Sequence, residues 1–275
     1  MVRDPPSQAI RGLVTRCGFA HHAGMRRPLT TRVRGSKPEP PVGDLSSDQR
    51  EAVGAVAKAA AAARNPLGRS VLVVGLAGGS GAGKSWLADR LLEAFPGRSL
   101  RLRIDDFYRD LSHLPMGRRE RVNFDRPQTI DWECFHQALE QLVSGGAADI
   151  PVYDFSTHTR RPERNPVRTK PLLLVEGLWP WWTPKLRRVF GLRVYVACPE
   201  SLRRDRRLER DQTERGRTRE AISSQLEKHV FPLHTRFVEP QRAWAHRVLR
   251  SPITAEDLAA LTAHIGSLLE DFGKK

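Results

Sequence analysis

Cysteine is scarce in this sequence, and long apolar runs are missing. The 275 residues contain three cysteines, Cys17, Cys134 and Cys198, which stand far apart and lack the spacing of a metal site. A disulfide scaffold is therefore not expected, and a reducing, cytoplasmic location is. No apolar run approaches the ~20 residues that cross a bilayer, so no contact with a membrane is expected.

Acidic residues are also few relative to basic ones. The chain has 46 Lys and Arg against 31 Asp and Glu, for a net charge of +15. Such an excess often marks a protein that binds nucleic acid. Here residues 1–69 carry 12 basic and 5 acidic side chains, and much of the rest lies between Arg203 and Arg219 with acids interleaved. That segment suits the phosphates of a small ligand at least as well as a duplex, so nucleic acid is not the expected partner.

Composition divides the chain into three segments. Residues 1–47, rich in Arg, Pro and Gly, predict a disordered basic tail, with an organelle-targeting segment as the alternative. Residues 48–69 predict an N-terminal helix and linker, because Asp48 and Glu51 have capping spacing and an Ala-rich run follows. Residues 70–275 predict one α/β domain.

The start of that domain, VLVVGLAGGSGAGKSWLADRLL at 71–92, holds the strongest motif in the sequence. An apolar run predicts a buried strand, leucines at helical spacing predict a helix, and the pattern G-x-x-x-x-G-K-S lies between them. Glycines let backbone N–H groups wrap a phosphate chain, and the helix N-terminus attracts the same anion. We therefore expect a nucleoside triphosphate site formed by Gly78, Gly79, Ser80, Gly81, Ala82, Gly83, Lys84, Ser85 and Trp86.

Within this motif, Lys84 would reach the outer phosphates and the Ser85 hydroxyl would bind Mg²⁺. Two downstream strands each end in an acid: the run Ser99–Ile104 precedes Asp105, and the run Leu172–Val175 precedes Glu176. The carboxyl ends of parallel strands face the ligand. Phosphoryl transfer to an alcohol needs a carboxylate near the hydroxyl, which makes Asp105 the candidate base, and Glu176 is expected to organise Mg²⁺.

The C-terminal half adds an arginine-rich segment. Residues 199–219 hold eight arginines against five acids, as expected of a mobile lid that neutralises phosphate charge when it closes. The aromatic and polar segment Pro151–Arg160 is interpreted as a recognition loop, and the turn with Trp179, Trp181 and Trp182 as packing. The expected fold is a doubly wound, mainly parallel α/β sheet of the P-loop kinase type with an arginine-rich lid.

The motifs AGGSGAGKS, IDDFYRD, NFDRP, PVYDFSTHTR, VEGL and RDQTERGR occur in an order and at spacings that resemble the uridine kinase (uridine-cytidine kinase) family of P-loop kinases. That family is related to phosphoribulokinase and pantothenate kinase. The resemblance extends from about Val71 to Leu249. It implies transfer of phosphate from ATP or GTP, with Mg²⁺, to the 5′-hydroxyl of uridine or cytidine, and it allows a homo-oligomer.

The resemblance also implies roles for individual residues. Asp105 and Lys84 would be catalytic, Ser85 and Glu176 would serve the metal, and Arg210 and Arg215 would reach the phosphates. The nucleoside would be held by Tyr108, Phe124, Asp125, Tyr153, His158, Arg160, Arg207, Arg217 and Gln225.

The sequence departs from the family pattern at several positions. Trp86 follows Ser85 where a small or hydroxylated residue is usual, and Asp106 replaces a serine. Ser201 and Arg204 stand where the lid usually has Asp and Leu. His246 replaces an acid near the nucleotide base, which leaves the choice of ATP or GTP open.

Two other functions remain as alternatives. The first is a kinase of the same fold that acts on another small alcohol, such as pantothenate, a sugar or a sugar phosphate; the motifs PVYDFSTHTR and NFDRP favour the nucleoside. The second is a non-catalytic nucleotide-binding regulator, against which Asp105, Glu176 and the lid arginines argue.

Overall fold

A computed structural model of the chain describes residues 71–213 and 216–274. The predicted tail at 1–47, the predicted helix and linker at 48–69, and Arg215 lie outside the described residues. None of the helices in the described part is long and apolar enough to cross a bilayer.

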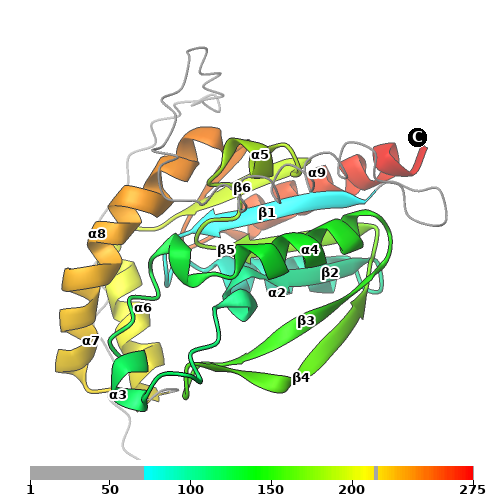
Figure 1. Cartoon of the computed structure of the whole chain (residues 1–275). Coiled ribbons are helices and arrows are strands. Elements are labelled where there is room, and N and C mark those ends of the chain that lie inside the picture. The colour runs from blue at the N-terminus through cyan, green and yellow to red at the C-terminus, as the bar shows by residue number, and fades with distance from the viewer. Residues whose placement is uncertain (1–70, 214–215, 275) are drawn as a thin grey trace, which may run out of the picture. The chain divides into compact units, whose positions relative to one another are not determined.

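The domain is organised around a five-stranded parallel sheet with the strand order β2-β5-β1-β6-β7 (Figure 1). Its strands are β1 (Leu72–Gly78), β2 (Ser99–Arg103), β5 (Leu172–Gly177), β6 (Leu192–Ala197) and β7 (Arg247–Arg250). Strand β1 is central, with β5 and β2 on one side of it and β6 and β7 on the other. The carboxyl end of β1 is therefore a topological switch point, where ligands bind in such sheets. The expected doubly wound parallel sheet is confirmed.

Helices cover both faces of the sheet because the side chains of β1 alternate between two cores. Leu72, Val74 and Leu76 pack with α2 (Lys84–Ala94) and α9 (Ala255–Lys274). Val73 and Ala77 face the other core, which α4 (Trp132–Val143) closes. Asp131 caps α4 by accepting a hydrogen bond from the Cys134 amide at 3.2 Å.

The three tryptophans after β5 belong to this second core, as expected. Trp179 and Trp181 are fully buried, and a Cβ added at Gly75 in the middle of β1 would lie 2.8 Å from the rings of Trp181 and Phe190. Glycine is therefore required at this position of the strand so that the rings can approach the backbone. The indole nitrogen of Trp181 donates to the carbonyl of Gln241 at 3.1 Å.

Two further parts lie beside the sheet (Figure 1). An antiparallel hairpin consists of β3 (Ala147–Asp154) and β4 (Thr159–Arg168), so the segment expected to be a loop at 151–160 forms the end of this hairpin. The helical segments α6 (Glu200–Thr213), α7 (Arg219–Gln225) and α8 (Phe231–Leu233) stand together at the other side, and π-helical turns at Leu226–Val230 and His234–Val238 flank α8. The remaining helices are α3 (Met116–Arg119) and α5 (Pro184–Arg187). Single 3-10 turns cover Ile104–Phe107, Pro127–Thr129 and Glu239–Trp244.

Candidate active site

The glycine-rich loop joins β1 to α2 in the expected conformation. Gly81 and Gly83 have φ angles of 78° and 99°, in the left-handed region that other residues avoid. Gly83 is the N-cap of α2 and provides no side-chain cap, so the first N–H groups of the helix remain available to an anion.

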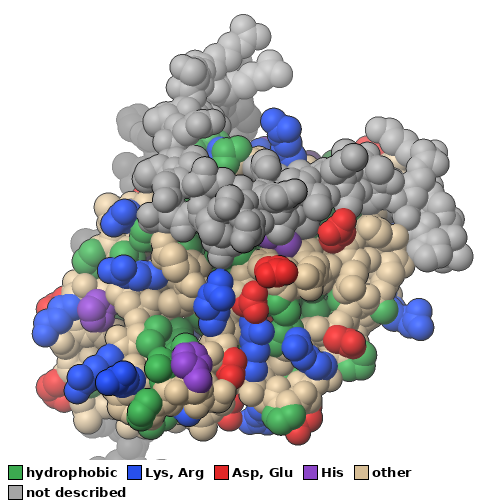
Figure 2. Space-filling model, viewed as in Figure 1, with side chains coloured by type: hydrophobic (Ala, Val, Ile, Leu, Met, Phe, Trp, Pro, Cys, Tyr) green, Lys and Arg blue, Asp and Glu red, His purple; other side chains and the backbone are tan. Residues whose placement is uncertain are grey.

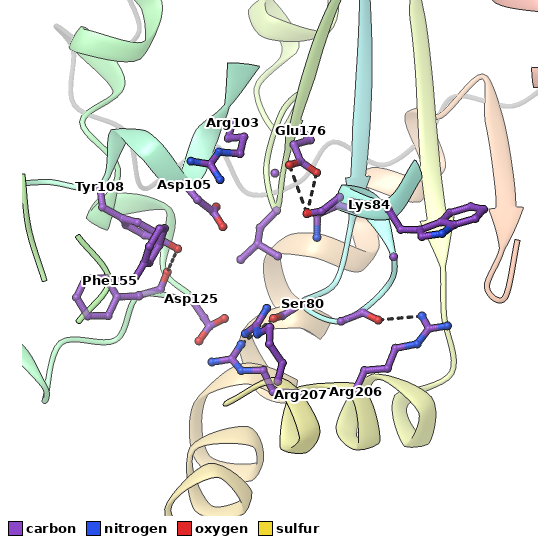
Figure 3. A pocket seen from close by; sticks show the side chains of 18 of the residues that line it. Ser80, Lys84, Arg103, Asp105, Tyr108, Asp125, Phe155, Glu176, Arg206 and Arg207 are labelled. Carbon is purple, nitrogen blue, oxygen red and sulfur yellow. Dashed lines mark hydrogen bonds between the residues drawn. The ribbon is translucent and has the colours of Figure 1, made fainter. Parts of the chain in front are cut away.

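Lys84 and Ser85, the first residues of α2, both line the cavity, and Figure 3 shows Lys84 there. The Lys84 ammonium donates to the carbonyl of Gly79 at 2.9 Å. Burial lowers the pKa of Lys84, although the carboxylates of Glu176 and Asp105 oppose this shift. The Ser85 hydroxyl donates to the Glu176 carboxylate, with its oxygen 3.3 and 3.4 Å from the two acceptor oxygens.

The pair formed by Ser85 and Glu176 fits a magnesium ion chemically. Mg²⁺ prefers hard oxygen ligands, and in phosphoryl-transfer sites it is held by one or two protein oxygens together with phosphate oxygens and water. The described residues contain no cluster of three or more His, Cys, Asp or Glu side chains that suits a metal. An ion at this site would therefore depend on the nucleotide for part of its coordination.

Asp105 follows β2, in the 3-10 turn that begins at Ile104. One carboxylate oxygen, Oδ1, is buried and has no hydrogen-bond partner within the described part of the chain. Burial raises the pKa of Asp105, while the nearby Lys84 ammonium counteracts that shift. Figure 3 shows the carboxylate turned toward the space in front of Lys84 and Glu176.

The far side of the site is aromatic. The ring of Tyr108 packs on the rings of Phe124 and Tyr153 at centroid distances of 5.2 and 5.4 Å, and Phe155 packs on Tyr153 at 5.2 Å. His158 stacks on Phe124 at 4.6 Å with an interplanar angle of 17°. The Tyr108 hydroxyl donates to the carbonyl of Phe124 at 3.0 Å.

Two polar groups lie among these rings. The Tyr153 hydroxyl oxygen is buried and finds no hydrogen-bond partner among the residues that the structure covers. Asp125 is buried, which raises the pKa of its carboxyl group, and the charge of Arg207 counteracts this shift. An aromatic pocket with a few polar groups suits a planar, hydroxylated ligand.

The arginines of α6 connect the lid to the glycine-rich loop. Arg207 donates to the Ser80 hydroxyl at 2.7 Å and to Asp211 at 2.6 Å. Arg206 donates to the carbonyl of Gly81 at 3.1 Å. Beyond the end of α6, Arg217 donates to the side chain of Gln225 at 2.9 Å. Arg206 and Arg207 therefore contact the glycine-rich loop directly, whereas Arg217 pairs with Gln225, as two residues expected at the nucleoside.

A single cavity of about 750 Å³ joins these groups (Figure 3). The predicted site residues that line it are Ser80, Gly81, Gly83, Lys84, Ser85, Trp86, Asp105, Tyr108, Phe124, Asp125, Tyr153, His158, Glu176, Arg207, Arg210, Arg217 and Gln225. The part of the cavity at the glycine-rich loop and its aromatic part are therefore open to each other, and Asp105 lies between them.

Comparison with known proteins identifies the family. The model of the phosphoribulokinase/uridine kinase family matches residues 73–256. The chain belongs to this family. Uridine kinase of Chloroflexus aggregans is 37% identical over 194 residues, which cover 69% of this chain and 93% of that protein. Uridine kinase of Deinococcus deserti is 37% identical over 178 residues, 64% of this chain and 86% of its own length.

The fold is also that of other kinases. D-glycerate 3-kinase from Cryptococcus neoformans superposes with a TM-score of 0.51 at 19% identity, over 76% of this chain and 98% of that structure. At this level of identity the likeness concerns the fold and not the substrate.

In this member of the phosphoribulokinase/uridine kinase family, one residue expected to hold the nucleoside lies elsewhere. Arg160 is not among the residues that line the cavity. Its guanidinium donates to the carbonyls of Tyr108 and Phe107 at 2.8 and 3.1 Å and forms an ion pair with Asp131 at 3.1 Å. Arg160 therefore stabilises the backbone at Phe107 and Tyr108, directly after Asp105, from outside the cavity.

Three residues of the predicted loop also lie outside the cavity lining: Gly78, Gly79 and Ala82. Gly79 packs against the lid instead, since a Cβ at this position would lie 2.6 Å from Arg203. His246, expected near the nucleotide base, accepts a hydrogen bond from the Arg193 amide at 3.3 Å and is not among the lining residues.

The cavity contains residues that the sequence analysis did not single out. Phe155 lies within the motif PVYDFSTHTR, which was the available signal for it. Ser251, Pro252 and Ile253 line the cavity together with Trp86, and the motifs gave no indication of them. Two arginines of β2, Arg101 and Arg103, also line it.

Proposed function

We propose that the protein transfers the γ-phosphoryl group of ATP or GTP to the 5′-hydroxyl of a pyrimidine nucleoside, uridine or cytidine. Support comes from relatives that carry the name uridine kinase and that the chain matches over most of their length. The observation that carries the proposal is the position of Asp105 between a phosphate-binding loop and an aromatic pocket in one cavity.

Asp105 has the properties of a base for this reaction. Its Oδ1 atom is buried without a partner in the described structure, and an acceptor hydroxyl would supply the missing hydrogen bond. A carboxylate there orients the hydroxyl for in-line attack and accepts its proton as the new P–O bond forms. The raised pKa of Asp105 makes it a stronger proton acceptor than an exposed aspartate.

The other charged groups balance the phosphates. Lys84 and the guanidinium groups of Arg206, Arg207 and Arg210 surround the phosphate end of the cavity and would offset the charge on the transferring group. Ser85 and Glu176 would hold Mg²⁺, which neutralises phosphate charge when it is bound. Most of the rate enhancement would then come from positioning and electrostatics.

The aromatic half would hold the nucleoside. Phe124 and Phe155 offer faces and edges to a pyrimidine ring, and Tyr153 offers a hydroxyl in need of a partner. Asp125 lies where it would accept hydrogen bonds from ribose hydroxyls. We also infer a cytoplasmic location from the scarcity of cysteine and a homo-oligomer from the family resemblance.

Nucleic acid is not the proposed partner. On the face shown in Figure 2, Lys and Arg side chains are interspersed with Asp and Glu side chains, whereas duplex binding favours a continuous basic surface. If the protein nevertheless bound nucleic acid through several phosphates, the affinity would fall steeply with salt.

The test is ADP release by the purified protein with Mg·ATP and a panel of uridine, cytidine, adenosine, pantothenate, ribulose 5-phosphate and fructose. Turnover with uridine or cytidine alone supports the proposal. Turnover only with a non-nucleoside would keep the role of Asp105 and overturn those of Tyr153 and His158. No turnover with any alcohol would favour a nucleotide-binding regulator.

A further inference from the structure

Arg101 is the one residue in the cavity lining that forms a two-nitrogen contact with Glu176. Its Nε atom lies 2.8 Å from Glu176 Oε1, and its Nη2 atom contacts the same oxygen. The third nitrogen, Nη1, donates to Asp89 on α2 at 2.7 Å. The Glu176 side chain is only 6% exposed and that of Arg101 18%, so this ion pair is largely shielded from water.

The register of the sheet explains why Arg101 reaches this carboxylate. Strand β2 pairs in parallel with β5, and Arg103 lies opposite Glu176. Side chains two residues apart point to the same face of a strand, so Arg101 and Arg103 lie on the face that α2 covers. Arg103 is engaged elsewhere, because its guanidinium binds Asp106. Arg101 is therefore left to bind Glu176.

Helix α2 completes the arrangement from the other side. Ser85 and Asp89 are four residues apart and therefore lie on the same face of the helix. Ser85 binds Glu176 directly, while Asp89 binds it through Arg101. Three groups thus determine the position of the Glu176 carboxylate: a hydroxyl, a guanidinium and the aspartate that holds that guanidinium.

We propose that Arg101 is a positioning residue for Glu176 that sets how strongly Mg²⁺ promotes nucleotide binding. Arg101 binds Oε1 with two donors, whereas Oε2 faces the Ser85 hydroxyl at 3.3 Å and would be the oxygen that serves the metal or its water molecules. Its positive charge also offsets the negative charge of Glu176, which limits the attraction of the site for a divalent cation. This inference rests on the nucleotide and metal roles in the proposed function, but not on the identity of the acceptor.

The experiment measures ADP binding by calorimetry, once with excess Mg²⁺ and once with a chelator. The ratio of the two dissociation constants reports how much Mg²⁺ strengthens binding, and no acceptor or turnover is needed. Arg101→Met removes the charge next to Glu176, so this ratio should rise by at least about fivefold, the effect of one unit charge at about 4 Å in bulk water; the shielding of this pair from water makes the effect larger. Arg101→Lys keeps the charge but cannot form the two-nitrogen contact, so the ratio should change less than in Arg101→Met.

A second variant, which should lower the ratio of the two dissociation constants, tests the inference if Arg101→Met does not fold. Removing one partner of a shielded ion pair can destabilise a protein, so Arg101→Met could fail to fold. Asp89 is 52% exposed, and Asp89→Asn should leave the fold intact. This change makes the site less negative, and the ratio should fall by about twofold.

The matched control is Arg90→Met, which removes an arginine of α2 that pairs with Glu93 outside the cavity. A change in the control as large as that in Arg101→Met would overturn the inference, as would a ratio unchanged in both Arg101→Met and Asp89→Asn. If the unaltered protein binds no ADP at all, the proposed nucleotide site itself is wrong. The two failures are therefore distinguishable.

Discussion

Arg207 of the lid helix donates to the hydroxyl of Ser80 in the glycine-rich loop at a distance of 2.7 Å. The same guanidinium binds Asp211, which also accepts two hydrogen bonds from Arg210. The charge of Asp211 therefore remains paired when Arg207 is removed. This makes Arg207 a residue whose function can be tested with little loss of folding.

We expect Arg207→Met to lower kcat/KM by about 100-fold, since one charge-assisted contact to the reacting groups is worth roughly 3 kcal/mol. Steady-state kinetics with Mg·ATP measure the effect. The control is Arg204→Met on the same helix, whose partners Glu200 and Glu227 are exposed. Equal losses in the two variants would show that the lid helix requires only its net charge.

Lys84→Ala should abolish phosphoryl transfer while the fold persists. The Lys84 side chain contacts the carbonyl of Gly79 and otherwise faces the cavity, so its loss leaves no apolar void. Circular dichroism and thermal melting would establish folding, and ADP release would establish activity. Near-normal turnover in a folded variant would refute the role of the loop.

Asp105→Asn should lower kcat by at least about 100-fold, because the amide cannot accept the proton of the acceptor. If the loss appeared only in KM, Asp105 would bind the substrate without acting as a base.

The raised pKa of Asp105 also predicts the pH dependence of activity in the unaltered protein. The reactive form is the carboxylate, so kcat should rise with pH as this group ionises. The rise should lie above the ordinary aspartate pKa of about 3.9. A kcat that is flat across this range, down to the pH at which the protein unfolds, would contradict the assignment.

The same shift predicts an effect on stability. The folded state holds the proton of Asp105 more tightly than the unfolded state, so this group destabilises the fold as pH rises above the unfolded pKa. Asp105→Asn should therefore melt at a higher temperature than the unaltered protein near pH 7, and the difference should shrink as the pH approaches 4. Calorimetric melts at several pH values measure it.

Tyr153→Phe tests the aromatic half. The hydroxyl of Tyr153 is buried without a partner in the described structure, so its removal should leave stability unchanged or slightly increased. If a nucleoside supplies the partner, KM for that nucleoside should rise by about 5- to 20-fold with a smaller change in kcat. Unchanged kinetics would remove Tyr153 from the substrate contacts.

The sequence predicted the centre of the fold more closely than its edges. The runs expected as strands at Ser99–Ile104 and Leu172–Val175 agree with β2 and β5 to within two residues, because the pattern of apolar residues is a local signal. The hairpin at 147–168 was missed, since β4 is exposed along most of its length and carries no apolar alternation. Its pairing with β3 is what makes it a strand.

The site shows a similar division. Asp105 and Glu176 were expected at one site because each follows a run expected as a parallel strand, and both line the cavity. Arg101 was not found, because its contact with Glu176 depends on the neighbouring strand and its register. Likewise, only the tertiary structure could place Arg160 behind Asp105 rather than in the cavity.

Gln241 has a consequence for how the cavity can open. Its side-chain amide donates to the carbonyl of Leu178 and accepts from the amide of Trp181, so the segment from α6 to Gln241 is tied at its end to the residues that follow β5, the strand that carries Glu176. The beginning of the segment is tied to β6, which leads directly into α6. A segment held at both ends behaves as an arch rather than as a hinged flap. Entry of a ligand would then require the part of this segment between its two ends, where Arg210 and Arg217 lie, to move away from the cavity while both ends stay in place.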